Sequence, residues 1–264
     1  MSTTSIATVL VQGASRGIGL QFCRTLLSRQ PNTCVIATCR NPNQADDLQR
    51  LLEDEPERLQ VLQVDVTEEA KIKAAAEEVG KRHGRLDLLI NCAGVLHPSG
   101  RGETSLRDVN MQGLTETCRT NAFGLLLMGK HFGQLLTKGT AMFGTHQPDS
   151  KRTHSGIMAN ISAKVGSITD NGLGGWYSYR MSKAALNMAT KNLSIELGRG
   201  RTPVICVALH PGTVDTDLSR PYHKNVKNLF TTEDSVKKLL TVIDSLTVDD
   251  TGKFFTYNKE LLPF

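Results

Sequence analysis

Short apolar segments alternate along the chain with longer segments in which apolar residues recur every three or four positions. The short segments are typical of strands buried on both faces of a sheet, and in the first half they are residues 6–12, 33–39, 59–65 and 86–91. The longer segments predict helices at 18–28, 45–52 and 68–82. Strands that alternate with helices in this way indicate βαβ units and a parallel sheet.

The second half of the chain continues the same alternation. Helices are predicted at 113–136, 177–197 and 233–246, and strands at 156–161, 204–209 and 253–257. Two polar stretches, 137–155 and 217–232, are long for connections in such a fold. Because no linker or repeat divides the sequence, we expect residues 1–264 to form one α/β domain. Its architecture is a doubly wound Rossmann fold with a mostly parallel sheet of about seven strands and helices on both faces.

Composition and charge exclude several classes of protein. The 31 basic residues are interleaved with 26 acidic ones, which argues against a nucleic-acid partner. The six cysteines form no Cys-x-x-Cys pair and the histidines have no zinc spacing, so no metal site is expected. The longest apolar stretch, 122–128, is too short to span a membrane, and the N-terminus does not resemble a secretory signal. We therefore expect a soluble cytoplasmic protein with reduced thiols and no membrane partner.

A glycine-rich loop follows the first predicted strand and begins the first predicted helix. Its sequence is Gly13-Ala-Ser-Arg-Gly-Ile-Gly19. Glycine lets the backbone turn sharply and approach a pyrophosphate closely, while the start of a helix presents unpaired N–H groups to the anion. The strand–loop–helix context therefore predicts a dinucleotide site. The expected contacts in this loop are Gly13, Ser15, Arg16, Gly17, Ile18 and Gly19.

The end of the second predicted strand bears on the choice between NAD and NADP. NAD-selective folds place an acidic residue here, which binds the ribose 2′-hydroxyl. This chain has Cys39 followed by Arg40. An arginine can pair with a 2′-phosphate, which an acid would repel. We therefore expect NADP(H), with Arg40 as the first candidate for the 2′-phosphate and Arg16 as the second.

Tyr179 and Lys183 are four residues apart in a segment that predicts a helix, so they lie on one face of that helix. A free tyrosine has a pKa of about 10 and exchanges protons poorly near neutral pH. An ammonium roughly 5 Å away, at an effective dielectric of about 20, favours the phenolate by about 3 kcal/mol. We therefore expect Lys183 to lower the pKa of Tyr179, which makes the pair a candidate acid/base catalyst.

The glycine spacing, Asn91-Cys-Ala-Gly94, the Tyr179-x-x-x-Lys183 pair and Pro211-Gly212 occur in the order found in short-chain dehydrogenases/reductases. The chain resembles this family over its whole length. The segment from Gly172 to Lys183 is most similar to carbonyl reductases of the sniffer and C-factor type. The resemblance implies an oxidoreductase that transfers hydride between NADP(H) and a small-molecule carbonyl or alcohol, as a homodimer or homotetramer.

The resemblance also implies roles for individual residues. Tyr179 exchanges a proton with the substrate, Lys183 binds the nicotinamide ribose and Asn121 holds a water in a proton relay. Further cofactor contacts are implied for Asp65, Val66, Asn91, Ala93, Gly94, Tyr179, Lys183, Pro211, Gly212, Val214 and Thr216.

One departure from the family pattern concerns the serine that polarises the substrate carbonyl. The family has Asn-x-Ser-Ser at the fifth strand, whereas this chain has Asn160-Ile-Ser-Ala163, with Ala163 at the active position. Ser162 is the first candidate to take that role, Ser167 the second, and the absence of any such serine is the third possibility. Neighbouring side chains on a strand face opposite ways, so Ser162 reaches the site only if the strand end twists.

Two further questions stay open at the level of the sequence. Trp176 and Tyr177 either border the substrate pocket or pack against another subunit. The basic and aromatic residues of 217–232 either favour an anionic substrate or form a solvated lid. Ala163 also motivates an alternative function, a dinucleotide-binding signalling or scaffold protein with little or no turnover.

Overall fold

The computed structural model describes residues 6–29, 31–145 and 153–264. Within these residues, seven strands form one sheet in which every neighbouring pair is parallel. In sheet order they are β3 (Leu59–Gln63), β2 (Thr33–Cys39), β1 (Ala7–Gln12), β4 (Leu88–Asn91), β5 (Ile157–Ile161), β6 (Ile205–His210) and β9 (Phe254–Thr256). The chain moves outward from β1 in one direction and then outward from β4 in the other, so the strand order reverses between these two strands. The predicted doubly wound Rossmann architecture is confirmed.

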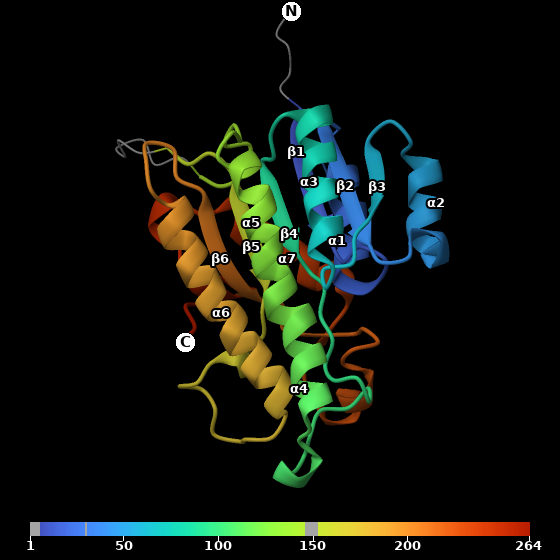
Figure 1. The fold of residues 1–264 in the computed structure, drawn as a ribbon, viewed down its shortest axis with the longest axis vertical. Coiled ribbons are helices and arrows are strands. Elements are labelled where there is room, and N and C mark those ends of the chain that lie inside the picture. Colours follow the sequence, from blue (N-terminus) through green and yellow to red (C-terminus); the bar gives the residue numbers. More distant parts are fainter. Residues whose placement is uncertain (1–5, 30, 146–152) are drawn as a thin grey trace, which may run out of the picture.

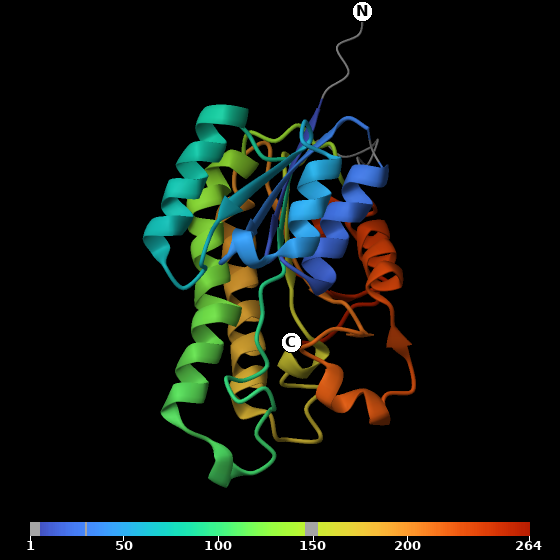
Figure 2. The same ribbon diagram turned by 90° about the vertical axis from the view of Figure 1, so that its right-hand side faces the viewer.

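Helices cover both faces of the sheet (Figures 1 and 2). One face carries α1 (Gly17–Arg29), α2 (Asp46–Asp54) and α7 (Thr232–Asp244). The opposite face carries α3 (Glu69–His83), α4 (Met111–Cys118), α5 (Gly124–Leu136) and α6 (Tyr177–Leu197). The loops that leave the carboxyl ends of the strands gather at the lower end of the molecule in both views. Ligand sites of open α/β sheets lie at this end.

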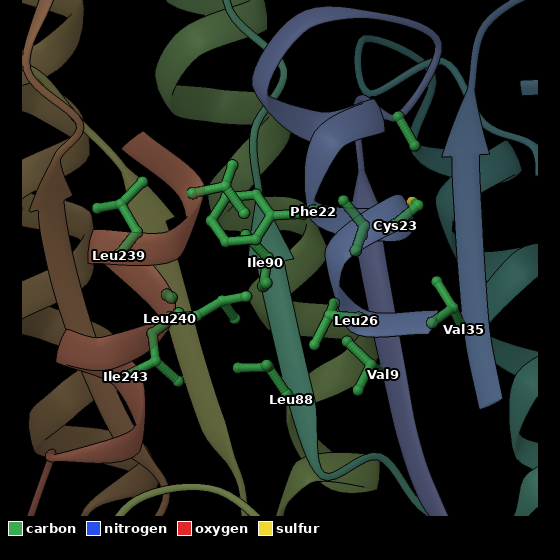
Figure 3. Packing of buried hydrophobic residues seen from close by; sticks show 14 of the residues in the cluster. Val9, Phe22, Cys23, Leu26, Val35, Leu88, Ile90, Leu239, Leu240 and Ile243 are labelled. Atoms are coloured by element: carbon green, nitrogen blue, oxygen red, sulfur yellow. The ribbon is translucent and has the colours of Figure 1, made fainter. Parts of the chain in front are cut away.

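The core consists of two apolar layers, one on each side of the sheet. Neighbouring residues of β1 belong to different layers, because side chains of a strand alternate between the faces. Val9 belongs to the layer that also contains Phe22 of α1 and Leu239 of α7 (Figure 3), whereas Leu10 belongs to the layer that contains residues of α3, α5 and α6. The sheet is therefore buried on both faces, which explains why its strands are almost continuously apolar in the sequence.

The predicted helix 113–136 is interrupted, which corrects that expectation. α4 ends at Cys118, a π-helical turn (η3, Arg119–Phe123) follows, and α5 begins at Gly124. The wider turn carries Asn121, one of the expected catalytic residues. Insertions of this kind are frequent at functional sites because they change the direction in which one side chain points.

The two long polar connections differ. Residues 146–152 of the stretch 137–155 lie outside the described residues. The stretch 217–232 contains a short helix, η5 (Arg220–Asn225), and strand β8 (Leu229–Phe230), which pairs with β7 (Thr213–Val214) beyond the end of β6. No helix among the described residues is both long and apolar enough to cross a membrane.

Candidate active site

A cleft of about 620 Å³ opens at the carboxyl ends of β1, β2, β3 and β4, beside the first turn of α1. Twelve of the residues predicted to bind the cofactor line it, namely Gly13, Ser15, Arg16, Gly17, Ile18, Gly19, Arg40, Asp65, Val66, Ala93, Gly94 and Thr216. The structure thus brings the ends of four strands and the loop after β7 together around one site.

The glycine loop has the close backbone packing that a dinucleotide site requires. Gly13 has a φ of +82°, and a Cβ atom there would lie 2.5 Å from the Ala93 nitrogen. A Cβ atom at Gly19 would lie 2.2 Å from the Gly13 oxygen. Any side chain at either position would therefore collide with backbone. The loop wraps tightly around the start of α1 and leaves its outer side open to the cleft.

Other predicted cofactor residues do not line this cleft. Asn91 is fully buried and donates from Nδ2 to Asn160 Oδ1 over 2.7 Å, which ties β4 to β5. Pro211 accepts a hydrogen bond from Ser235, while Gly212 is packed against Phe230. The remaining members of this group are Val214, Tyr179 and Lys183. For Asn91 the side chain acts in the sheet, so any contact with a ligand would have to come from its backbone.

Three arginines stand at the end of the cleft near β2. Arg40 has an exposed side chain that makes no hydrogen bond or ion pair with the described residues. Arg16 Nε lies 3.5 Å from Asp217 Oδ2, and Arg24 Nη2 lies 3.8 Å from Asp47 Oδ1. Arg24 lies on α1, eight residues after Arg16, and was not predicted to line the cleft. Of these three arginines, Arg40 alone has no carboxylate within 4 Å of its guanidinium among the described residues.

Tyr179 and Lys183 are both buried in the first half of α6. Lys183 Nζ donates to the Ile161 carbonyl over 2.8 Å and lies 5.7 Å from the centre of the Tyr179 ring. Burial raises the pKa of Tyr179 to about 12 and lowers the pKa of Lys183 to about 8. The predicted lowering of the Tyr179 pKa is therefore not observed. The reason is that loss of water disfavours the charged forms of both side chains, while the Lys183 ammonium donates to a backbone carbonyl.

Asn121 joins α6 to the loop after β4. Its Oδ1 accepts from the Val95 nitrogen over 2.8 Å, and its Nδ2 donates to the Val95 oxygen over 2.8 Å and to Ser182 Oγ over 2.9 Å. A Cβ atom built on Gly94 would lie 3.6 Å from Asn121 Oδ1 and 3.7 Å from Lys183 Nζ. Asn121 and Lys183 therefore both lie beside Gly94, which lines the cleft.

The structure does not bring Ser162 to Tyr179, which corrects its placement in the catalytic group. Ser162 Oγ donates to Asn187 Oδ1 over 2.7 Å. Asn187 stands eight residues after Tyr179 on α6, about 12 Å along the helix. A helical side chain also leans toward the N-terminus, which moves the Tyr179 hydroxyl further away. Ser162 thus lies on the side of β5 that packs against the middle of α6, as strand alternation requires.

The other serine candidate is also engaged elsewhere. Ser167 is buried, and its hydroxyl accepts a hydrogen bond from the Asp170 nitrogen over 3.1 Å. Ala163 has extended backbone (φ −152°, ψ 145°) and is the second residue of the loop that connects β5 to α6. The residue that matches the serine of the family pattern is therefore Ala163, whose side chain is a methyl group that cannot donate a hydrogen bond.

Aromatic residues and a buried acid surround the start of α6. The sequence analysis singled out Trp176 in this group but not Glu103. The rings of Trp176 and Tyr222 are 4.7 Å apart and those of Trp176 and Tyr179 are 6.2 Å apart. Trp176 therefore packs within its own chain beside Tyr179. Glu103, which no sequence pattern singled out, is buried against Ser178.

Comparison with known proteins agrees with this geometry. The family model for short chain dehydrogenase matches residues 7–227. An NADPH-bound carbonyl reductase from chicken fatty liver has a TM-score of 0.84 and 33% identity, covering 99% of this chain and 100% of that chain. The carbonyl reductase Sniffer of D. melanogaster has a TM-score of 0.84 and 28% identity, with the same coverage. The C-signal protein of Myxococcus xanthus is 35% identical over 181 residues, which are 69% of this chain and 94% of that protein.

This chain belongs to the short-chain dehydrogenase family. It is an oxidoreductase of that family, and among its structural relatives are carbonyl reductases of the sniffer type.

Proposed function

We propose that this protein is an NADP(H)-dependent carbonyl reductase. The observation that carries the proposal is the buried Tyr179–Lys183 pair, since Lys183 and Asn121 lie next to Gly94, which lines the cleft beside the glycine loop. The residues present fit a dinucleotide, because Gly13 and Gly19 leave no room for side chains and Arg40 offers an unpaired guanidinium to a phosphate. The 33% identity to an NADPH-bound carbonyl reductase supports the same conclusion.

The protein's contribution is to position the substrate and to supply a proton. NADPH, when bound, supplies the hydride for the carbonyl carbon. Tyr179 protonates the carbonyl oxygen, and burial favours its protonated form, since its pKa is raised to about 12. Lys183 is proposed to bind the nicotinamide ribose, and Asn121 to hold the loop that borders it. The test of this proposal is oxidation of NADPH in the presence of a reactive quinone or dicarbonyl.

Arg40 is proposed to select NADP(H) over NAD(H). Replacing Arg40 by alanine is expected to lower kcat/KM for NADPH by about 10- to 100-fold, because one charge-assisted contact to the 2′-phosphate is lost. The value for NADH should stay within about twofold, since NADH has no such phosphate. Steady-state kinetics with both cofactors measures the effect. Arg201→Ala removes an arginine that is exposed elsewhere and serves as the control. Equal losses with both cofactors would contradict this role of Arg40.

We further propose that two copies of the chain associate through α6. Met181, Met188 and Ile195 are seven residues apart and exposed, and they form an apolar stripe along this helix. Met188→Glu is expected to raise the dimer dissociation constant by at least about 100-fold, since it would bury an unpaired charge. Sedimentation analysis measures the constant, with Ala74→Glu on exposed α3 as the control. A monomeric parent protein, or a Met188→Glu variant that dimerises like the parent, would contradict this interface.

A second candidate function is a dinucleotide-binding signalling protein with little or no turnover. Two observations favour it, namely the methyl group at position 163 and the 35% identity to C-signal over 181 residues. Binding of NADPH without its oxidation across a panel of aldehydes, ketones and quinones would support this alternative over the reductase.

A further inference from the structure

The catalytic helix α6 begins without a cap of its own. Its N-cap residue is Trp176, whose backbone is left-handed (φ +50°, ψ 42°) and whose side chain makes no capping hydrogen bond. Tyr179 is the third residue of the helix, so its position depends on how firmly the first turn is held. The N–H groups of a first turn have no partner within the helix and need acceptors from elsewhere.

Glu103 supplies those acceptors from a distant part of the chain. Its carboxylate oxygen Oε1 accepts from the Ser178 nitrogen over 3.1 Å and also from the Ser178 hydroxyl. Its backbone oxygen accepts from the Trp176 nitrogen over 2.6 Å. The residue is 3% exposed, so these contacts are shielded from water. A negative charge at this end of a helix is also favoured by the helix dipole.

The neighbouring residue, Gly102, holds the ring of Trp176 in place. A Cβ atom at Gly102 would lie 2.5 Å from the indole, so the ring is packed directly on the backbone. The Gly102 nitrogen donates to the Tyr222 hydroxyl over 3.0 Å, and the Tyr222 ring packs against the indole with 4.7 Å between the ring centres. The indole in turn meets the Tyr179 ring edge-on. The segment Gly102–Glu103 therefore contacts the backbone and the aromatic surroundings of the catalytic tyrosine together.

We propose that Glu103 is a positioning residue that caps α6 and thereby fixes Tyr179 and Trp176 at the active site. The expected effect on kcat rests on the proposed reductase function, whereas the expected effect on the first turn of α6 does not. Only Oε1 forms the cap, since Oε2 is buried without a hydrogen-bond partner among the described residues. His97 lines the cleft and places its Nε2 4.0 Å from Oε1, beyond hydrogen-bond distance. A glutamine at position 103 can therefore form the same cap, whereas alanine cannot.

The test compares Glu103→Ala with Glu103→Gln. We expect Glu103→Ala to lower kcat by at least about tenfold while the dissociation constant for NADPH stays within about twofold, because the cofactor cleft is intact and only the tyrosine is displaced. Glu103→Gln should retain kcat within about threefold of the parent, since its amide oxygen accepts the same hydrogen bonds. Glu116→Ala, which removes an exposed carboxylate of α4, is the control.

A second measurement does not require turnover. Trp176 is the single tryptophan of the chain, so its fluorescence reports on the start of α6 alone. Glu103→Ala should shift the emission to longer wavelength and increase quenching by acrylamide, whereas Glu103→Gln should match the parent. If the alanine variant does not fold, Glu103→Asp takes its place, because it keeps the charge but withdraws the oxygen by one methylene.

Four results would overturn the inference. The first is a Glu103→Ala variant with parental kcat and parental fluorescence. The second is loss of activity in Glu103→Gln with unchanged fluorescence, which would assign the carboxylate a chemical role in place of a positioning one. The third is a Glu103→Asp variant with parental kcat and fluorescence. The fourth applies if the parent protein shows no turnover: unaltered fluorescence of Glu103→Ala or Glu103→Asp would then overturn the inference. The absence of turnover alone bears only on the proposed reductase function.

Discussion

Replacing Tyr179 by phenylalanine is expected to lower kcat for carbonyl reduction by about 1000-fold, within the range that loss of a general acid produces. The hydroxyl is the group proposed to protonate the substrate oxygen. Phenylalanine keeps the ring that contacts Trp176 and covers Lys183 Nζ, so the fold and the cofactor cleft should be unchanged. Single-turnover and steady-state assays with NADPH and a quinone measure the loss, and a fluorescence titration measures NADPH binding.

The neighbouring tyrosine provides the control for this experiment. Tyr177 is half-buried in the same helical turn, and Tyr177→Phe removes a hydroxyl of the same kind without touching the proposed acid. It should retain activity within about threefold, because its hydroxyl is not the group proposed to protonate the substrate. Turnover by Tyr179→Phe at more than about a tenth of the parental rate would contradict the proposed role of the tyrosine.

Introducing a serine at position 163 is expected to raise kcat by about 100-fold, since one hydrogen bond to a developing oxyanion typically contributes a factor of this size. The backbone at Ala163 is extended, lies two residues beyond the end of β5 and occupies the position that matches the serine of the family pattern, so a hydroxyl introduced there is expected to face the substrate carbonyl. The gain should appear in kcat more than in KM, because the oxygen bears most charge in the transition state.

Ser162→Ala is the matched partner of that variant. It removes the hydroxyl that donates to Asn187, so it should reduce stability while kcat stays within about threefold. A large loss of kcat in Ser162→Ala, together with no gain in Ala163→Ser, would show that the strand end rearranges and that Ser162 acts after all.

Local patterns in the sequence were sufficient to predict the sheet and the glycine loop that lines the cleft. The strands are apolar because both faces are buried, and the glycine loop is read from residues that are neighbours in the chain. The π-helical turn at Asn121 could not be predicted in this way, since its sequence continues the helical pattern on both sides. Its geometry is fixed by contacts with Val95 and Ser182, which are distant in sequence.

The pKa values of the Tyr179–Lys183 pair were harder to predict than its location. Spacing places Tyr179 and Lys183 on one face of a helix, but their pKa values depend on burial by the whole fold, which the sequence does not display. The same applies to Glu103, whose proposed role rests on a hydrogen bond across 75 residues of sequence. A single acidic residue in a loop carries no local pattern that distinguishes it from a solvated one.

Transfer of deuterium from NADPH labelled at the C4 position of the nicotinamide tests the central claim most directly. The protein is mixed with the labelled cofactor and a dicarbonyl, and the product alcohol is examined by mass spectrometry. The reductase proposal predicts deuterium on the former carbonyl carbon in the parent protein and its near absence with Tyr179→Phe. Binding of the labelled cofactor by the parent protein without deuterium in any product across the carbonyl panel would contradict it.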